Sequence, residues 1–182
     1  MKKRYMLWTV VVVFVLSIPV LYKGMKLFNA NYLLHSAQER VGQTVPDLSG
    51  TDLDGNLYRL HDYIGKKNVV IVFWASWCRS CRKEIPHIKT LFEKKNGNEE
   101  LLLLSSSIDT DIGTLKALIE KENIPYPVII DKEGKGKESK FNAFFALTHL
   151  PSIWVIDKHG VVVAHNLLNI QEAFKVVREL RY

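Results

Sequence analysis

The stretch from residue 68 to residue 81 constrains the fold more than any other part of the chain. It begins with NVVIVFWA, a continuous run of mainly β-branched and aromatic residues, which predicts a strand buried on both faces. Cys78 and Cys81 follow, and the spacing of apolar residues over 84–95 then indicates a helix. Because such a strand needs helices on both sides of its sheet, we expect an α/β domain in which a cysteine pair opens a helix after a central strand.

Strand and helix patterns continue to alternate through the rest of the domain. Asp54-Gly55 lies between short apolar stretches of residues 46–60, which is typical of a hairpin. Early helices between strands imply parallel pairing, whereas two late strands joined by a turn at Gly160 imply an antiparallel pair. The result is a mixed sheet flanked by helices. The expected strands cover residues 68–75, 101–107, 127–131, 152–156 and 161–165, and the expected helices cover residues 84–95, 114–123, 139–146 and 170–180.

The formal net charge of +6 does not indicate nucleic-acid binding. Five of the 25 basic residues lie within residues 1–26, which contain no acidic residue, and this leaves 20 basic residues against 19 acidic ones in the remainder. A protein that binds nucleic acid through its phosphates needs a basic field on the folded domain. We therefore expect no nucleic-acid partner.

The basic residues near the N-terminus flank an uncharged apolar run from Met6 to Tyr22, long enough to cross a membrane as one helix. A cleaved signal peptide is the alternative, but its apolar core is usually shorter and no good small-x-small cleavage site follows. The basic residues before the run favour a cytoplasmic N-terminus. We predict a single-pass cell-membrane anchor at residues 1–26, a polar tether at residues 27–43 and an extracytoplasmic domain at residues 44–182.

The two cysteines, the only ones in the chain, are placed to act as a redox pair. Cys78 falls at the start of the expected helix, where unpaired backbone N–H groups and the helix dipole favour a thiolate. Cys81 lies one turn further on the same face, so it can attack a mixed disulfide formed at Cys78. Half of a zinc site is the alternative, but structural zinc needs four ligands and the chain has no second cysteine pair.

The residues around this pair resemble the FWAxWCxxCxxExP signature of the TlpA/ResA/CcmG-like branch of the thioredoxin superfamily. In this chain the matching residues, from 73 to 86, read FWASWCRSCRKEIP. The resemblance covers residues 44–182 and implies a thioredoxin-like fold with an N-terminal β-hairpin extension and a central insertion. It also implies thiol-disulfide oxidoreductase activity that needs no cofactor and no metal.

Roles for individual residues follow from the resemblance. Cys78 is expected to be the exposed nucleophile and Cys81 the resolving thiol, and the two form a redox-active disulfide. Glu84, one turn after Cys81, is expected to carry protons for that thiol.

The resemblance also implies a substrate-binding element opposite the pair. Pro151 is expected to be the family's cis-proline, facing Cys78, although few X–Pro bonds are cis. The backbone of Leu150 is expected to pair with an extended substrate segment as an added strand, with Trp77 at the rim of the site.

Two departures from the family pattern bear on the chemistry. Val72 occupies the position at which many thioredoxins carry a buried aspartate, which leaves Glu84 with less competition as the proton carrier. The dipeptide Arg79-Ser80 is neither the Gly-Pro of thioredoxin nor the Glu-Pro frequent in this branch. Because this dipeptide tunes the reduction potential, the redox direction stays open.

The function that these features favour is an extracytoplasmic reductase of protein disulfides, re-reduced by a membrane electron donor. Cytochrome c maturation is the family-level expectation for its substrate. A disulfide-forming oxidase with the same fold and a metal-binding protein, for example one that delivers copper, remain alternatives. A peroxidase is disfavoured, because the chain lacks a threonine-and-cysteine peroxidatic motif.

Overall fold

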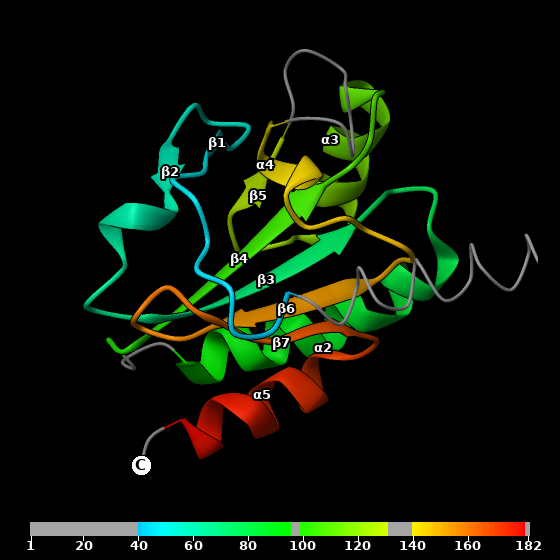
Figure 1. Ribbon diagram of the computed structural model, residues 1–182. Helices are drawn as coiled ribbons and strands as arrows, with labels where there is room; N and C mark the ends of the chain where they lie inside the picture. The colour runs from blue at the N-terminus through cyan, green and yellow to red at the C-terminus, as the bar shows by residue number, and fades with distance from the viewer. Residues whose placement is uncertain (1–39, 96–98, 131–139, 181–182) are drawn as a thin grey trace, which may run out of the picture. The chain divides into compact units, whose positions relative to one another are not determined.

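A five-stranded mixed sheet forms the centre of the computed structural model, which describes residues 40–95, 99–130 and 140–180 (Figure 1). These residues all lie within one unit, Arg40–Tyr182. The predicted anchor at residues 1–26 and residues 27–39 of the predicted tether lie outside them. Within the described part, none of the helices combines the length and hydropathy that a membrane span requires.

The elements follow one another along the chain in nearly the predicted order. The strands are β1 (Ser49–Thr51), β2 (Leu57–Arg59), β3 (Asn68–Trp74), β4 (Leu101–Ser107), β5 (Val128–Ile129), β6 (Ser152–Ile156) and β7 (Val162–Leu167). The helices are α2 (Arg79–Lys95), α3 (Ile112–Glu122), α4 (Lys140–Ala143) and α5 (Ile170–Glu179), and a short 3-10 helix, η1 (Leu60–Asp62), follows the hairpin. Only η1 has no counterpart in the sequence prediction.

Strand β3 lies at the middle of the sheet, whose order is β5-β4-β3-β6-β7. It pairs in parallel with β4 on one side and antiparallel with β6 on the other, and β6 pairs antiparallel with β7. All of its residues are buried, which is why its sequence is continuously apolar rather than alternating. The mixed sheet predicted from the sequence is therefore confirmed.

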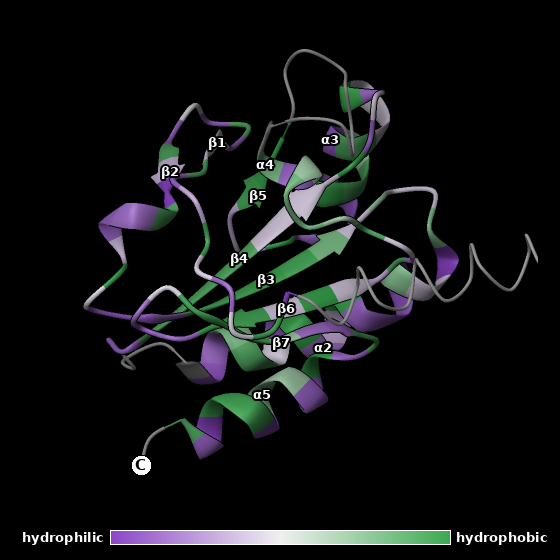
Figure 2. Cartoon of the chain, in the orientation of Figure 1, coloured by the Kyte–Doolittle hydropathy of each residue, from purple (hydrophilic) through white to green (hydrophobic). Residues whose placement is uncertain are grey.

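The two faces of β3 contribute to two hydrophobic clusters. Val70, Val72 and Trp74 face the cluster that contains side chains of α2, α3 and α5. The alternate residues, Val69 and Ile71 among them, face a second cluster with η1, the segment around α4, and β6. Figure 2 shows β3 apolar along its length and α5 alternating between apolar and polar residues, as expected for a helix with one buried face. The prediction of helices on both faces is confirmed.

The predicted hairpin at residues 46–60 is present as β1 and β2, which pair antiparallel outside the main sheet. Its turn is built around Asp54-Gly55, and Gly55 has a φ of 87°, a conformation that favours glycine. Thr51 joins the hairpin to the sheet edge, because the Ile130 N–H donates to the Thr51 carbonyl at 2.9 Å. The extension therefore packs beside β5 as part of the same domain.

Helix α2 begins at Arg79, directly after Cys78 as expected for the redox pair, and so extends beyond the helical spacing found over residues 84–95. Helices α3 and α4 differ from their predicted bounds for local reasons. Helix α3 begins at residue 112 instead of 114, because the Asp111 side chain accepts hydrogen bonds from the backbone of Gly113 and Thr114 and caps the helix. Helix α4 ends at Ala143, before the predicted end at 146. Ala146 has a φ of 43°, and a left-handed residue there is incompatible with a longer helix.

Candidate active site

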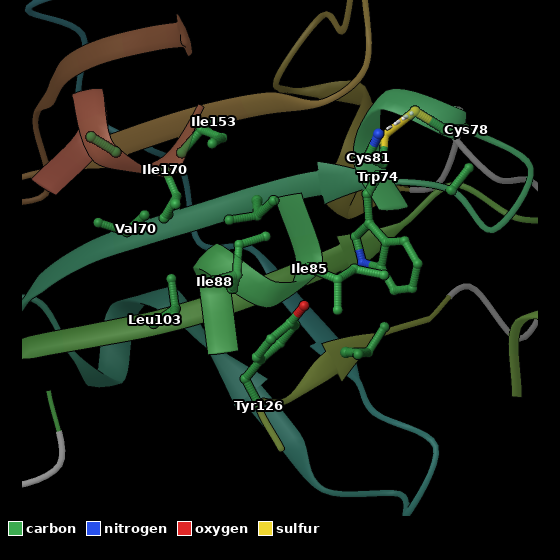
Figure 3. Packing of buried hydrophobic residues seen from close by; sticks show 14 of the residues in the cluster. Val70, Trp74, Cys78, Cys81, Ile85, Ile88, Leu103, Tyr126, Ile153 and Ile170 are labelled. Carbon is green, nitrogen blue, oxygen red and sulfur yellow. Dashed lines mark hydrogen bonds between the residues drawn. A yellow bond between two sulfur atoms is a disulfide. The ribbon is translucent and has the colours of Figure 1, made fainter. Parts of the chain in front are cut away.

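Cys78 and Cys81 are joined by a disulfide at the point where the chain leaves the carboxyl end of β3 and enters α2 (Figure 3). The Cys78 carbonyl accepts the Arg82 N–H at 3.1 Å, so Cys78 sits directly before the first turn of the helix. The backbone N–H of Cys81 points at the Cys78 sulfur, with 3.2 Å between N and Sγ. A donor in this position would stabilise negative charge on Cys78 when the disulfide is reduced.

The two sulfur-bearing residues differ in access. Cys78 is 7% exposed, less than the resemblance implied, but it lines an open groove of about 470 Å³. Cys81 is 2% exposed and is not among the residues that line this groove, although both cysteines belong to the core cluster that contains Trp74 (Figure 3). An incoming disulfide or thiol in the groove meets Cys78 first. The roles of Cys78 as nucleophile and Cys81 as resolving thiol stay predictions.

The groove brings together residues that lie far apart in the sequence. Trp77, which is 67% exposed, forms its rim beside Cys78, and Leu150 lines it from the loop before β6. Ile108 and Leu147 add apolar side chains to the wall of the groove. The structure therefore places three of the predicted site residues, Trp77, Cys78 and Leu150, around one concave surface.

The Leu150–Pro151 peptide bond is cis, as the resemblance predicted. Pro151 is buried and directly precedes β6. The loop meets the cysteine motif through Ser80, whose hydroxyl donates to the Leu150 carbonyl at 3.3 Å. The same hydroxyl oxygen lies 3.3 Å from the Cys78 sulfur.

Glu84 lies on α2, one turn after Cys81, and is half-buried. Its carboxylate accepts the backbone N–H of Ile170, the first residue of α5, at 3.3 Å. A carboxylate at a helix N-terminus interacts favourably with the helix dipole. Glu84 therefore connects two helices next to the disulfide, and its proton-transfer role stays a prediction.

A buried polar cluster beneath the active-site loop was missed by the sequence reasoning. Asp109, which is 3% exposed, accepts the Ser76 backbone N–H at 2.8 Å and the Ser76 hydroxyl at 2.6 Å. It also accepts the Ser107 hydroxyl at 2.7 Å. Ser76 follows β3 and Asp109 follows β4, and the carboxyl ends of neighbouring parallel strands meet at one edge of a sheet. That topological relation is the signal that could have found the cluster.

His149 contributes to the wall of the groove, and its ring is half-buried. The Nδ1 atom lies 3.1 Å from the Thr148 hydroxyl, and the Nε2 atom is buried without a hydrogen-bond partner in the described part of the chain. The same part holds no group of three or more His, Cys, Asp or Glu side chains arranged to bind a metal ion.

A profile of the AhpC/TSA family matches residues 41–165, which is more than half of the chain. The chain belongs to this family. It is 32% identical over 164 residues to the thiol-disulfide oxidoreductase ResA of Bacillus cereus, a match that covers 90% of this chain and 88% of that protein. The thioredoxin-like protein YneN of Bacillus subtilis is 29% identical over 144 residues, covering 78% and 79% of the two chains.

Solved structures give the same result for the fold. The thioredoxin domain of a thiol-disulfide oxidoreductase from Bacteroides vulgatus superposes with a TM-score of 0.63 at 25% identity, over 78% of this chain and 98% of that one. Together with the relatives, the Cys78–Cys81 disulfide identifies the chain as a ResA-like thiol-disulfide oxidoreductase with a thioredoxin-like fold.

Proposed function

We propose that this oxidoreductase is a membrane-anchored, extracytoplasmic reductase of protein disulfides. The observation that carries the proposal is the groove in which Cys78 lies beside the Leu150 backbone while Cys81 is buried behind it. An extended polypeptide can lie along Leu150 and present one sulfur to Cys78, and this is how a strand added to a binding edge is recognised. A small thiol needs no such edge.

The proposed reaction proceeds in two exchanges. The Cys78 thiolate attacks one sulfur of the substrate disulfide, which forms a mixed disulfide and releases the other substrate sulfur as a thiolate. Cys81 then loses its proton, attacks the Cys78 sulfur and releases the second substrate thiolate. Two electrons pass from the enzyme to the substrate disulfide. Cys78 has already lost its proton to form the thiolate, Cys81 gives its proton to a nearby base, and the two substrate thiolates take up protons from solvent.

We assign the proton of Cys81 to Glu84 as its first acceptor. Glu84 lies one turn from Cys81 on the same helix, and it is half-buried, so a proton can be passed on toward solvent. Its hydrogen bond to the Ile170 N–H holds the carboxylate in place at this end of α2.

The location and the physiological substrate are proposed from the sequence. The apolar run at residues 6–22 serves as the anchor, with the domain on the extracytoplasmic side. Each turnover leaves Cys78 and Cys81 oxidised, so a membrane dithiol donor must supply two electrons for the next one. The substrate class is a protein disulfide formed between neighbouring cysteines, such as the haem-binding thiols of an apocytochrome c.

A trapping experiment on the full chain tests this function. In Cys81→Ser the mixed disulfide at Cys78 cannot be resolved, so we expect a covalent adduct with a protein substrate on non-reducing gels of acid-quenched cells. Cys78→Ser is the matched control and should give no adduct and no activity. The absence of any protein adduct with Cys81→Ser would argue against a protein substrate.

The direction of the reaction is tested by the reduction potential of the full chain in detergent. A value near or below about −230 mV supports a reductase, and a value near about −120 mV would assign the protein to the disulfide-forming oxidases instead.

A further inference from the structure

The hydroxyl of Ser80 lies between two atoms that matter for catalysis. Its oxygen is 3.3 Å from the Cys78 sulfur and 3.3 Å from the carbonyl oxygen of Leu150. Ser80 is exposed in the first turn of α2, so nothing buried holds its hydroxyl in one direction. A hydroxyl carries a single proton and can donate to only one of the two acceptors at a time.

The redox state of Cys78 changes which acceptor is stronger. In the disulfide, the Cys78 sulfur is uncharged and a weak acceptor, and the hydroxyl donates to the Leu150 carbonyl. After reduction, a Cys78 thiolate carries negative charge, and hydrogen bonds to ionised acceptors are roughly twice as strong as neutral ones. The proton then favours the sulfur, over the same 3.3 Å separation.

We propose that Ser80 is a positioning residue that couples the redox state of Cys78 to the substrate-pairing carbonyl of Leu150. In the reduced enzyme the hydroxyl donates to the thiolate, and the carbonyl is free to accept a backbone N–H from the substrate. In the oxidised enzyme the hydroxyl donates to that carbonyl. A substrate N–H therefore binds the carbonyl without competition when a disulfide substrate must bind, and competes with the Ser80 hydroxyl for it when the reduced product must leave.

The role of the carbonyl in binding rests on the proposed function, since it assumes an extended polypeptide substrate. The movement of the hydroxyl does not. It depends only on the contacts among Ser80, Cys78 and Leu150, so it can be tested without any substrate protein.

The first test follows the ionisation of Cys78 in the reduced full chain through the pH dependence of its alkylation by iodoacetamide. Ser80→Ala removes the donor to the thiolate, so the apparent pKa of Cys78 should rise by about one unit. Ser80→Thr keeps a hydroxyl at the same position and should restore the wild-type value. Arg79 and His149 line the groove with Cys78, and Cys81 lies behind it. All three groups are unchanged in these variants, so the difference reports Ser80 alone.

The second test observes the Leu150 carbonyl directly by nuclear magnetic resonance. Leu150-Pro151 is the only leucine–proline dipeptide in the chain, so labelling leucine carbonyl carbon and proline nitrogen isolates one signal. In the oxidised full chain, Ser80→Ala should move that carbonyl signal toward its position in the reduced wild type. Ser80→Thr should leave it in place.

The proposal requires both results. An unchanged apparent pKa of Cys78 in Ser80→Ala, or a Leu150 carbonyl signal in oxidised Ser80→Ala that coincides with the wild type, would overturn it. Failure of the reductase proposal has a different signature, because it would appear as a missing protein adduct with Cys81→Ser while both of these measurements keep their expected values.

Discussion

Asp109 and Asp52 are both buried carboxylates that accept several hydrogen bonds, but they connect the chain over very different distances. The partners of Asp52 lie within the hairpin: it accepts the backbone N–H groups of Asp54 and Asn56, the Asn56 side-chain amide and the Tyr58 hydroxyl, at 2.9–3.2 Å. Asp109, by contrast, reaches Ser76, which is 33 residues away in the sequence. One carboxylate closes a local turn, and the other ties together the ends of two strands.

This difference teaches where the active-site geometry comes from. The hairpin can keep its shape from residues within a short segment, since the side chain of Asp52 replaces backbone hydrogen bonds in the turn. In the loop that carries Cys78, by contrast, the backbone N–H of Ser76 finds its acceptor far away in the sequence. The acceptor is the Asp109 carboxylate, which is in position only because β4 pairs in parallel with β3.

The largest effect is expected from Asp109→Ala. The change leaves the buried Ser76 N–H and two hydroxyls without their acceptor, which should lower the free energy of unfolding by about 3 kcal/mol. Because the loop before Cys78 loses its anchor, the rate at which reduced Cys78 attacks a small aromatic disulfide should also fall about tenfold. Chemical denaturation and stopped-flow kinetics measure the two quantities.

Ser76→Ala provides the control for this prediction. It removes one hydroxyl but keeps the backbone N–H that Asp109 holds, so it should lower the unfolding free energy by only about 1 kcal/mol with little change in rate. An unchanged exchange rate in Asp109→Ala would mean that the loop keeps its geometry without the carboxylate, and the contrast with Asp52 would disappear.

A smaller effect is expected from Asp52→Ala, which should lower the unfolding free energy by about 1.5 kcal/mol while the exchange rate stays at its wild-type value. The hydrogen-bond partners of Asp52 given above all lie within the hairpin, and the described residues that line the groove include none from the hairpin. A fall in the exchange rate comparable to that of Asp109→Ala would show that the hairpin also supports the active site.

The pH dependence of stability sharpens the same prediction. Burial acts to raise the pKa of Asp52, but hydrogen bonds from Asn56, Tyr58 and Asp54 outweigh it and lower the pKa. The ionised Asp52 therefore stabilises the fold above about pH 4, and this stabilisation is lost as the pH falls through the lowered pKa.

Tyr58 acts at the alkaline end of the pH range. Burial, followed by the charge of Asp52, raises the pKa of Tyr58 from 10.0 to about 12. The stabilisation of the fold by the neutral Tyr58 is therefore lost as the pH rises from 10.0 to about 12.

Asp52→Asn separates the acidic and alkaline losses of stability. It removes the charge next to Tyr58, so the pKa of Tyr58 should fall in a tyrosinate absorbance titration yet stay above 10.0, because burial remains. In denaturation experiments between about pH 2 and 4, the free energy of unfolding should fall less steeply with decreasing pH than in the wild type. A fall as steep as in the wild type would mean that other carboxylates cause the loss of stability in acid.

The smallest effect on stability is expected from Glu84→Gln. Glu84 is a third carboxylate, and it accepts one long-range hydrogen bond. The amide oxygen can still accept the Ile170 N–H, so the unfolding free energy should change by less than about 0.5 kcal/mol. The variant cannot take up a proton, so exchange should slow and its pH–rate profile should lose one ionisation. Glu84→Ala is the control, since it removes the acceptor of the Ile170 N–H as well as the charge. A pH–rate profile of Glu84→Gln identical to the wild type would contradict the proton-transfer role.

Much of the fold was predictable because local patterns encode it. The continuous apolar run of β3, the helical spacing after Cys81 and the Asp54-Gly55 turn each act over a few residues, and all three appear in the structure where they were expected. The bounds were less predictable where a single residue decides them, as Asp111 does for α3 and Ala146 for α4.

The sequence by itself determined the redox pair, its position at the start of a helix and the class of chemistry, because these depend on residues adjacent in the chain. Only the tertiary structure decided which groups surround the pair. The contact of Ser80 with Leu150 spans 70 residues and that of Glu84 with Ile170 spans 86. No local pattern encodes such contacts, since they form only after β3, β4 and β6 pair and helices α2 and α5 pack on the sheet. The sulfur chemistry of the active site therefore depends on residues adjacent in the chain, whereas the groups that position the sulfur atoms are brought there by the tertiary structure.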